Sequence, residues 1–190
     1  MKKAFFFSFS LLYCICFWGC SGSKNMASDS AYVPFTNKLK DRILKNDLDL
    51  KKVQFFIDQK LILKRSLGTR KVNKSGVLLF ENGEYVQEVI IPKYTPGVCD
   101  SINGNKLMVS FELQNNDLQF GPGLYTPDYF MLYGRNWTNG VGDLTYDNQT
   151  YKVSCGSCSF ATEAKLVVKK SQADKIDTKQ RVAKGRKVDG

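Results

Sequence analysis

Two cysteines separated by two residues are the first candidates for chemistry in this sequence. Cys155-Gly156-Ser157-Cys158 has the spacing of a thiol–disulfide redox motif. A catalytic thiol of this kind lies at a helix N-terminus, where the dipole lowers its pKa. Here both flanks alternate as β-strands do, and Cys155 and Cys158 share the parity of the apolar Val153 and Phe160. We therefore predict a structural disulfide across a hairpin turn. Redox catalysis, a metal site shared with Cys99 and free buried thiols are the alternatives.

The absence of histidine narrows the chemistry further. No histidine occurs among the 190 residues, which excludes Ser-His-Asp and Cys-His nucleophile systems and histidine metal ligands. Aspartates and glutamates are scattered, and no spacing singles out one pair for acid–base work. We assign no catalytic residue, no metal site and no cofactor.

Aromatic residues gather around one arginine between residues 121 and 142. The set comprises Tyr125, Tyr129, Tyr133, Arg135 and Trp137. Tyrosine, tryptophan and arginine are frequent anchors of binding sites, so this region is a candidate for binding a sugar or a protein. The alternative is that Tyr129, Met131 and Tyr133 form one face of a strand and fill the core. We expect Trp137 to be exposed on a loop.

Basic residues concentrate in a second region, between two apolar runs. Arg65, Arg70, Lys71 and Lys74 form a predicted basic patch there, and the whole chain has a formal net charge of +10 at pH 7. Such a surface favours anionic partners. The alternative is an ordinary solvated loop.

The elements that must position these residues are mainly β-strands. Residues 77–120 consist of apolar runs of strand length separated by turn residues, and the remaining chain packs around them. Asn82-Gly83 favours a two-residue type I′ turn, and a second tight turn is expected at Asn103-Gly104. Thr95-Pro96-Gly97 is suited to a type II turn. This spacing predicts a mainly β protein, an antiparallel meander forming a small barrel or sandwich.

The strands and the helix outside this centre follow from periodicity. Alternation at Leu107, Val109, Phe111 and Leu113 predicts one buried face. Residues 53–63 read as a first hairpin, and residues 144–153 as another that turns at Asp147-Asn148. Leu39, Ile43 and Leu44 define the apolar face of one short N-terminal amphipathic helix that begins after Pro34. Ala164, Leu166 and Val168 are in register on a strand over 160–168.

The N-terminus has the composition of an export signal. Lys2 and Lys3 precede an apolar run that ends in Gly19-Cys20, and this run is shorter than the roughly 20 residues of a membrane span. The Gly19-Cys20 junction resembles the lipobox of bacterial lipoproteins, although Phe17 and Trp18 replace the usual leucine and small residue. The resemblance implies that Cys20 is lipidated and becomes the first mature residue. It covers only this segment, and the folded domain resembles no family that we identify.

These observations divide the chain into four parts. Residues 1–19 are a signal peptide, 20–33 a lipidated tether, 34–170 the β domain, and 171–190 a basic tail that is partly disordered, a short helix begun by a Ser171–Asp174 capping box, or an edge strand. The resemblance to lipoproteins implies the bacterial cell envelope, and the lack of an aspartate after Cys20 favours the outer membrane.

The expected function is that of a lipid-anchored, non-enzymatic binding or accessory protein of the envelope. Its partners would be the membrane, through the lipid anchor, and an anionic glycan, lipid or acidic protein; nucleic acid is not expected for an exported chain. The alternatives are a periplasmic thiol–disulfide oxidoreductase using Cys155 and Cys158, and a carbohydrate-binding module using residues 125–137.

Overall fold

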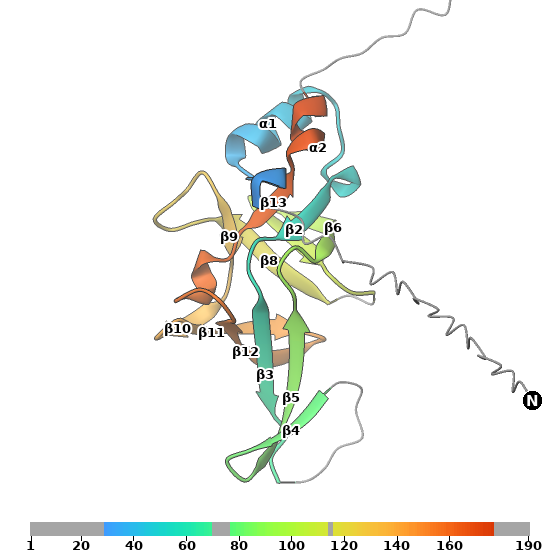
Figure 1. Ribbon diagram of the computed structural model, residues 1–190. Helices are drawn as coiled ribbons and strands as arrows, with labels where there is room; N and C mark the ends of the chain where they lie inside the picture. Colours follow the sequence, from blue (N-terminus) through green and yellow to red (C-terminus); the bar gives the residue numbers. More distant parts are fainter. Residues whose placement is uncertain (1–28, 70–76, 114–115, 177–190) are drawn as a thin grey trace, which may run out of the picture.

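A computed structural model describes residues 29–69, 77–113 and 116–176. The fold is mainly β, as predicted, with two antiparallel sheets that pack as a sandwich and do not close into a barrel. In Figure 1 the larger sheet occupies the upper half and the smaller sheet the lower half, with both α-helices at the top. Neither helix in the described ranges has the length and hydrophobicity needed to cross a membrane.

The larger sheet has seven strands in the order β1-β13-β2-β6-β7-β8-β9. Their bounds are β1 Tyr32–Pro34, β2 Gln54–Ile57, β6 Pro96–Asn103, β7 Lys106–Ser110, β8 Asp117–Pro122, β9 Phe130–Leu132 and β13 Leu166–Lys169. The smaller sheet has six strands in the order β10-β11-β12-β3-β5-β4. Their bounds are β3 Leu61–Ser66, β4 Val77–Glu81, β5 Glu84–Ile91, β10 Arg135–Thr138, β11 Val141–Tyr146 and β12 Gln149–Cys155. Every pairing within both sheets is antiparallel.

The predicted first hairpin over residues 53–63 is wrong. β2 pairs with β6 and β13, whereas β3 pairs with β5 and β12, so the chain passes from one sheet to the other between them. β5 and β6 cross at the same place, and the Tyr94 amide donates to the Ile57 carbonyl over 2.7 Å. The polar residues 58–60 form this sheet-to-sheet corner, which is how strands continue between the layers of a sandwich.

Of the four tight turns predicted from residue types, two form as predicted, one is shifted and one is wrong. Asn82 and Gly83 have φ of 51° and 82°, and Asp147 and Asn148 have φ of 50° and 54°, so both predicted hairpins form with primed turns. The turn between β6 and β7 lies one residue later than predicted, because Asn103 pairs with Lys106. The predicted type II turn at residues 95–97 is also wrong. Pro96 and Gly97 begin β6, and the chain turns before them.

The N-terminal helix α1 (Asn37–Lys45) is capped by Thr36, whose hydroxyl accepts the Leu39 amide. Leu39 and Ile43 are buried as predicted, but Leu44 is half exposed, because it lies off the narrow stripe that faces the core. A second helix, α2 (Lys170–Ile176), begins at Lys170, so Ser171 lies inside the helix and not at a capping position.

Three short 3₁₀ turns complete the described structure: η1 Asp29–Ala31, η2 Leu50–Lys52 and η3 Ala161–Glu163. η1 and most of β1 lie within the predicted tether over residues 20–33, and β1 pairs with β13. The Tyr32 ring stacks on Tyr94 with centroids 4.1 Å apart, and Asp29 accepts from Lys93 and Tyr94. Residues 29–33, which fall in the predicted tether, thus contact the β domain in the described structure.

The core lies between the inner faces of the two sheets. Leu107 and Val109 on β7 and Leu166 and Val168 on β13 are fully or almost fully buried, as their alternation predicts. Leu113 is 90% exposed, because β7 ends at Ser110 and the pattern continues beyond the strand.

Candidate functional site

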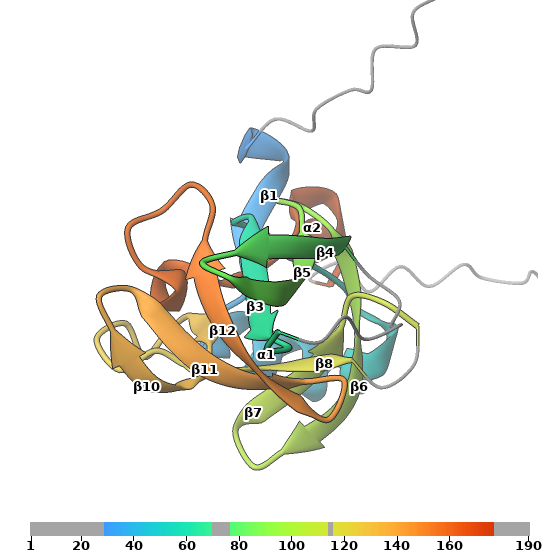
Figure 2. The same cartoon turned by 90° about the horizontal axis from the view of Figure 1, so that it is seen from below.

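A groove of about 380 Å³ lies where the two sheets meet beside β8 and β11. β11 packs next to β8 across this junction (Figure 2). The walls are Met108, Asp117, Leu118, Gln119, Tyr133, Gly134, Arg135, Asp143, Leu144 and Thr145. Polar and charged side chains from both sheets thus converge on one concave surface, the arrangement that fixes the orientation of a bound ligand.

A second groove, of about 490 Å³, adjoins the first on the outer face of the larger sheet. It is lined by Pro96, Val98, Asp100, Ser110, Phe111, Glu112 and Leu113. Ser110 in the second groove is the cross-strand partner of Asp117 in the first. The two grooves therefore occupy neighbouring positions on one exposed face.

Asp117 and Asp100 form a carboxyl pair between the grooves. Burial and the neighbouring Asp100 carboxyl raise the pKa of Asp117 to about 6, because two close carboxylates cannot both ionise freely. Asp100 occupies an irregularity between β6 and β7, where the pairing shifts between Cys99 and Ser101. Such a bulge redirects a side chain.

Asp143 has the opposite environment on the other wall. Its carboxylate accepts from Asn136 over 2.8 Å and forms an ion pair with Lys152 at 2.6 Å. These contacts, with Lys152 first, lower the pKa of Asp143. The groove thus offers one carboxyl that holds a proton near pH 6 and one that stays ionised.

Tyr133 and Arg135 are the two members of the predicted aromatic set that line the groove. The Lys106 ammonium lies 3.4 Å from the centre of the Tyr133 ring, so one face of that ring carries a cation. Arg135 is exposed and is the cross-strand partner of Asp143. The sequence prediction therefore located part of this site.

The other members of that set lie elsewhere. Tyr125 is 92% exposed and Tyr129 is 37% exposed, and neither lines the groove. The alternative that Tyr129, Met131 and Tyr133 fill the core is wrong, because Phe130 and Leu132 are the buried residues of β9. The parity of β9 is set by the position at which its backbone pairs with β8.

Trp137 is not exposed on a loop as expected. It lies on β10, is half-buried and packs against the core. Its ring covers Gly142, where an added Cβ would lie 2.5 Å from the ring. The glycine on the neighbouring strand leaves the space that the indole occupies, so Trp137 supports the wall of the groove from behind.

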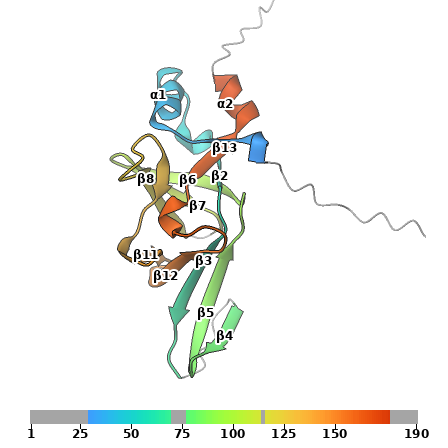
Figure 3. The same cartoon turned by 60° about the vertical axis from the view of Figure 1, so that its left-hand side comes forward.

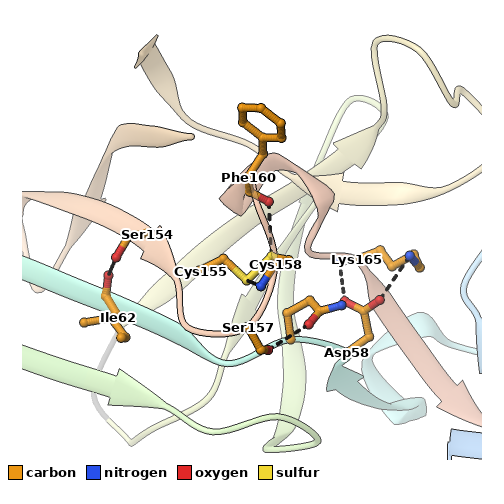
Figure 4. The surroundings of a disulfide bond; sticks show 9 residues. Asp58, Ile62, Ser154, Cys155, Ser157, Cys158, Phe160 and Lys165 are labelled. Atoms are coloured by element: carbon orange, nitrogen blue, oxygen red, sulfur yellow. Dashed lines mark hydrogen bonds and ion pairs between the residues drawn. A yellow bond between two sulfur atoms is a disulfide. The ribbon is translucent and has the colours of Figure 1, made fainter. Parts of the chain in front are cut away.

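Cys155 and Cys158 are joined by a disulfide. Both are half-buried. The Cys158 amide donates to Cys155 Sγ over 2.9 Å, while Cys158 Sγ lies 3.2 Å from the Phe160 carbonyl oxygen (Figure 4). Cys155 Sγ is the sulfur that this amide could stabilise as a thiolate, but Cys155 packs against the core. This environment favours a structural bond over a catalytic one.

The disulfide loop is fastened to the sheet-to-sheet corner. The Gly156 amide donates to the Lys60 carbonyl over 2.8 Å, and the Ser157 hydroxyl donates to Gln59. Asp58 is buried at the same corner, accepts the Lys165 amide and forms an ion pair with Lys165 Nζ at 3.1 Å (Figure 4). One polar cluster thus joins the ends of β2, β12 and β13.

The far end of the same loop contacts the hairpin that forms the groove. The Ala161 amide donates to the Gly140 carbonyl, and Gly140, with φ of +81°, lies against Ser159 and Phe160. Gly140 is the turn between β10 and β11, which carry Arg135 and Asp143. The disulfide is therefore connected through the loop to one wall of the groove.

The predicted basic patch is only partly within the described residues. Arg70, Lys71 and Lys74 lie outside them. Arg65 donates to Gln87 and Gln149 and lies over the Tyr151 ring, so its guanidinium is already engaged.

The remaining cysteine, Cys99, is buried, and burial raises the pKa of its thiol to about 11. Among the residues that the structure describes, no three Cys, His, Asp or Glu side chains are grouped so as to hold a metal ion. Cys20 lies outside the described residues.

Comparison of the chain with known protein families, with curated proteins and with solved structures finds no match in any of the three. The functional interpretation therefore depends on the geometry of the groove. Asp117, Gln119, Asp143 and Thr145 were not predicted as site residues. Each of these four residues is a polar position that alternates with buried residues on β8 or β11. This alternation was the sequence signal that could have marked them as surface residues of the site.

Proposed function

We propose that the protein is a lipid-anchored, non-enzymatic component of the bacterial cell envelope that binds an envelope glycan in the groove beside β8 and β11. The observation that supports this function is the convergence of Tyr133 and Arg135 with amide, hydroxyl and carboxyl side chains on one concave surface. Two of these residues belong to the aromatic region that the sequence indicated.

The chemistry of the groove suits a glycan. Sugars present many hydroxyl groups, each a donor and an acceptor. Arg135 supplies donors, Asp143 supplies acceptors, and Gln119 and Thr145 supply both. The groove walls combine acidic and basic groups, which favours a polar ligand of low net charge over a strongly charged one.

The proposal is for binding without turnover. Asp143 is already engaged by Lys152 and Asn136, and its contacts fix the carboxylate against the β10–β11 hairpin. A carboxylate held in this way is suited to orienting a hydroxyl group. The thiol–disulfide alternative receives less support, since the bond lies in a loop that fastens the fold.

The lipid anchor would place the groove close to the envelope surface. Eight residues separate Cys20 from Asp29, the first residue that the structure describes. An extended chain spans at most about 3.6 Å per residue, so this tether reaches roughly 30 Å. Attachment at that distance raises the local concentration of an envelope glycan around the groove.

The test is binding of fragments of peptidoglycan and of outer-membrane polysaccharide to the purified full chain in detergent. Arg135→Ala and Tyr133→Ala should each weaken binding by at least about fivefold, corresponding to about 1 kcal/mol. Tyr125→Ala is the matched control, because this exposed tyrosine lies outside the groove. Equal affinities for all three variants, or no binding of any fragment by the native chain, would contradict the proposal.

The dependence of glycan affinity on salt concentration shows whether the bound glycan is charged. The Debye length falls from about 10 Å at 0.1 M to about 3 Å at 1 M salt, so binding of an anionic glycan should weaken steeply over this range. A neutral glycan held by hydrogen bonds in the groove should bind almost equally at both concentrations.

A further inference from the structure

The strand β4 forms one outer edge of the smaller sheet, on an arm that extends from the body. β4, β5 and the end of β3 project away from the larger sheet in two views (Figures 1 and 3). The strand order ends at β4, so among the described residues no strand pairs with its outer edge. Phe80 on this strand is 65% exposed.

The three other sheet edges have features that discourage pairing with another chain. β1 has three residues and ends in Pro34, and β9 also has three residues. β10 carries Arg135 and has an irregular register with β11. Short length, proline, charge and irregularity are the usual protections of an edge strand.

β4 lacks these protections. Its five residues, Val-Leu-Leu-Phe-Glu, pair with β5 without a break, from Val77 opposite Glu88 to Glu81 opposite Glu84. It contains neither proline nor a basic residue. An open, regular and apolar edge is a template for an added strand.

The hydrogen-bonding pattern shows which backbone groups face outward. The Tyr85 amide donates to the Gly68 carbonyl, and the Tyr85 carbonyl accepts from the Leu67 amide, so the Tyr85 backbone faces the β3 side. Its cross-strand partner Phe80 therefore occupies a non-hydrogen-bonded pair. The amide and carbonyl groups of Phe80, and by alternation those of Leu78, point toward the open edge.

We propose that this edge pairs with β4 of a second copy of the same chain, antiparallel and around a twofold axis at Leu79. Leu78 of each copy then lies opposite Phe80 of the other, and the outward amides and carbonyls of these two positions satisfy each other in both directions. A twofold interface uses the same patch on both subunits, and this strand is complementary to itself in that register.

Charge selects the antiparallel arrangement. Glu81 is the only charged residue of β4, and the antiparallel register places the two Glu81 residues at opposite ends of the paired strands. Parallel pairing would place them side by side, where like charges destabilise a sheet. Glu81 also keeps its ion pair with Lys64 of its own chain, at 2.6 Å.

The aromatic side chains of the arm provide the apolar contribution. Phe80 and Tyr85 lie opposite each other on β4 and β5, with ring centroids 5.2 Å apart. They have the same parity as Leu63 and Val153, which are fully buried in the body of the sandwich. The core face of the smaller sheet thus continues onto the arm, and a second arm would cover the exposed Phe80 ring.

The register is tested by cysteine crosslinking of the full chain in detergent. At the axis, Leu79 of each copy would form a non-hydrogen-bonded pair with Cα atoms about 4.5 Å apart, within the range for a disulfide. Leu79→Cys should give a dimer that is sensitive to reducing agent, whereas Asn82→Cys, in the exposed hairpin turn, should not. Equal crosslinking at both positions, or none at Leu79→Cys, would overturn the proposal.

A backbone variant tests the pairing without crosslinking. Phe80→Pro removes an amide that faces outward and takes no part in pairing β4 with β5, so it should abolish the dimer measured by sedimentation. Phe80→Ala is the matched control: it loses the ring, as Phe80→Pro does, but it keeps the outward amide. It should therefore retain a weakened dimer. Thermal unfolding within a few degrees of the native chain verifies that both variants fold. A native chain that stays monomeric at all concentrations, or one that pairs through β4 only with a different protein, contradicts the twofold pairing.

Discussion

At the scale of single residues, two aspartates in one groove have opposite proton affinities. Asp117 is partly buried next to Asp100, and its pKa rises, whereas Asp143 is held by Lys152 and Asn136, and its pKa falls. The difference comes from the neighbours and not from the residue type. In mildly acidic conditions one wall therefore has a carboxyl that is partly protonated, and the other has a carboxylate that stays ionised and accepts hydrogen bonds.

Asp117→Asn should stabilise the fold above pH 6 and have little effect in acid. The pKa of Asp117 is raised from an ordinary 3.8 to about 6 in the folded state. The folded state therefore binds more protons than the unfolded state between these values, and the free energy of unfolding falls as the pH rises through this window. Asparagine removes this loss, which we estimate at about 1–2 kcal/mol at pH 7.5 after allowing for solvent screening.

Urea unfolding at pH 3.5 and pH 7.5 measures this effect. Asp41→Asn, on the exposed face of α1, is the control for loss of one carboxylate outside the groove. A destabilised Asp117→Asn variant at pH 7.5 would show that the Asp117 carboxylate is favourable in the folded protein.

At the scale of elements, the corner at Asp58 determines how the chain changes sheets. Asp58 is buried and accepts the Lys165 amide over 2.8 Å, which joins the end of β2 to the start of β13. Burial is the largest effect on this carboxyl and raises its pKa, against the opposing effect of Lys165. The hydrogen bond from the Lys165 amide is the largest of the opposing effects, so we expect it to stabilise the corner more than the ion pair does.

Asp58→Ala should lower the free energy of unfolding by about 1–3 kcal/mol, because it leaves the partly buried Lys165 amide without its Asp58 acceptor. Asp58→Asn retains an oxygen acceptor and should cost less than half as much. Denaturant unfolding of both variants at pH 7 gives the comparison. Equal losses would assign the stability to the ion pair with Lys165 Nζ and not to the amide.

The disulfide loop is a second connection at this scale. Replacing both Cys155 and Cys158 with serine should lower the free energy of unfolding by about 2 kcal/mol or less, since a loop of this length removes little chain entropy from the unfolded state. The melting temperature should fall by several degrees. A change in glycan affinity together with this small loss would show that the loop maintains the β10–β11 wall. An unchanged melting temperature would indicate that the bond does not form in the isolated protein.

At the scale of the whole molecule, the proposed function depends on attachment to the membrane. Several lysines in the described part of the chain are paired with acidic side chains. Ion pairs are formed by Lys64, Lys93, Lys152 and Lys165. These four lysines are therefore less available to an anionic membrane surface, and we expect charge alone to give only weak association for this part of the chain. The lipid on Cys20 would then be the main source of membrane association.

Cys20→Ala should release the protein from the membrane fraction and abolish incorporation of an acyl label. Cys14→Ala and Cys16→Ala are matched controls in the same segment and should leave both properties unchanged, because neither cysteine follows a small residue. Acyl labelling that persists in the Cys20→Ala variant would contradict the proposed anchor.

The sequence by itself determined several local features. Alternation predicted the buried faces of β7 and β13, and residue types able to adopt positive φ located the turns at Asn82-Gly83 and Asp147-Asn148. The spacing of Cys155 and Cys158, together with their inward strand parity, predicted the disulfide that the structure contains. These features depend on neighbours along the chain, so the sequence contains the information that they need.

Only the tertiary structure decided which strands pair and which polar residues share a surface. Residues 53–63 look like a hairpin locally, but Ile57 and Leu61 belong to different sheets, because burying both inner faces requires the chain to turn a corner at Asp58. The groove brings together Asp117 on β8, Tyr133 in the link between β9 and β10, and Asp143 on β11. Their proximity depends on register and on the packing of the two sheets. Sequence periodicity assigns each residue to a face, whereas the contacts between distant faces are fixed only when the whole core packs.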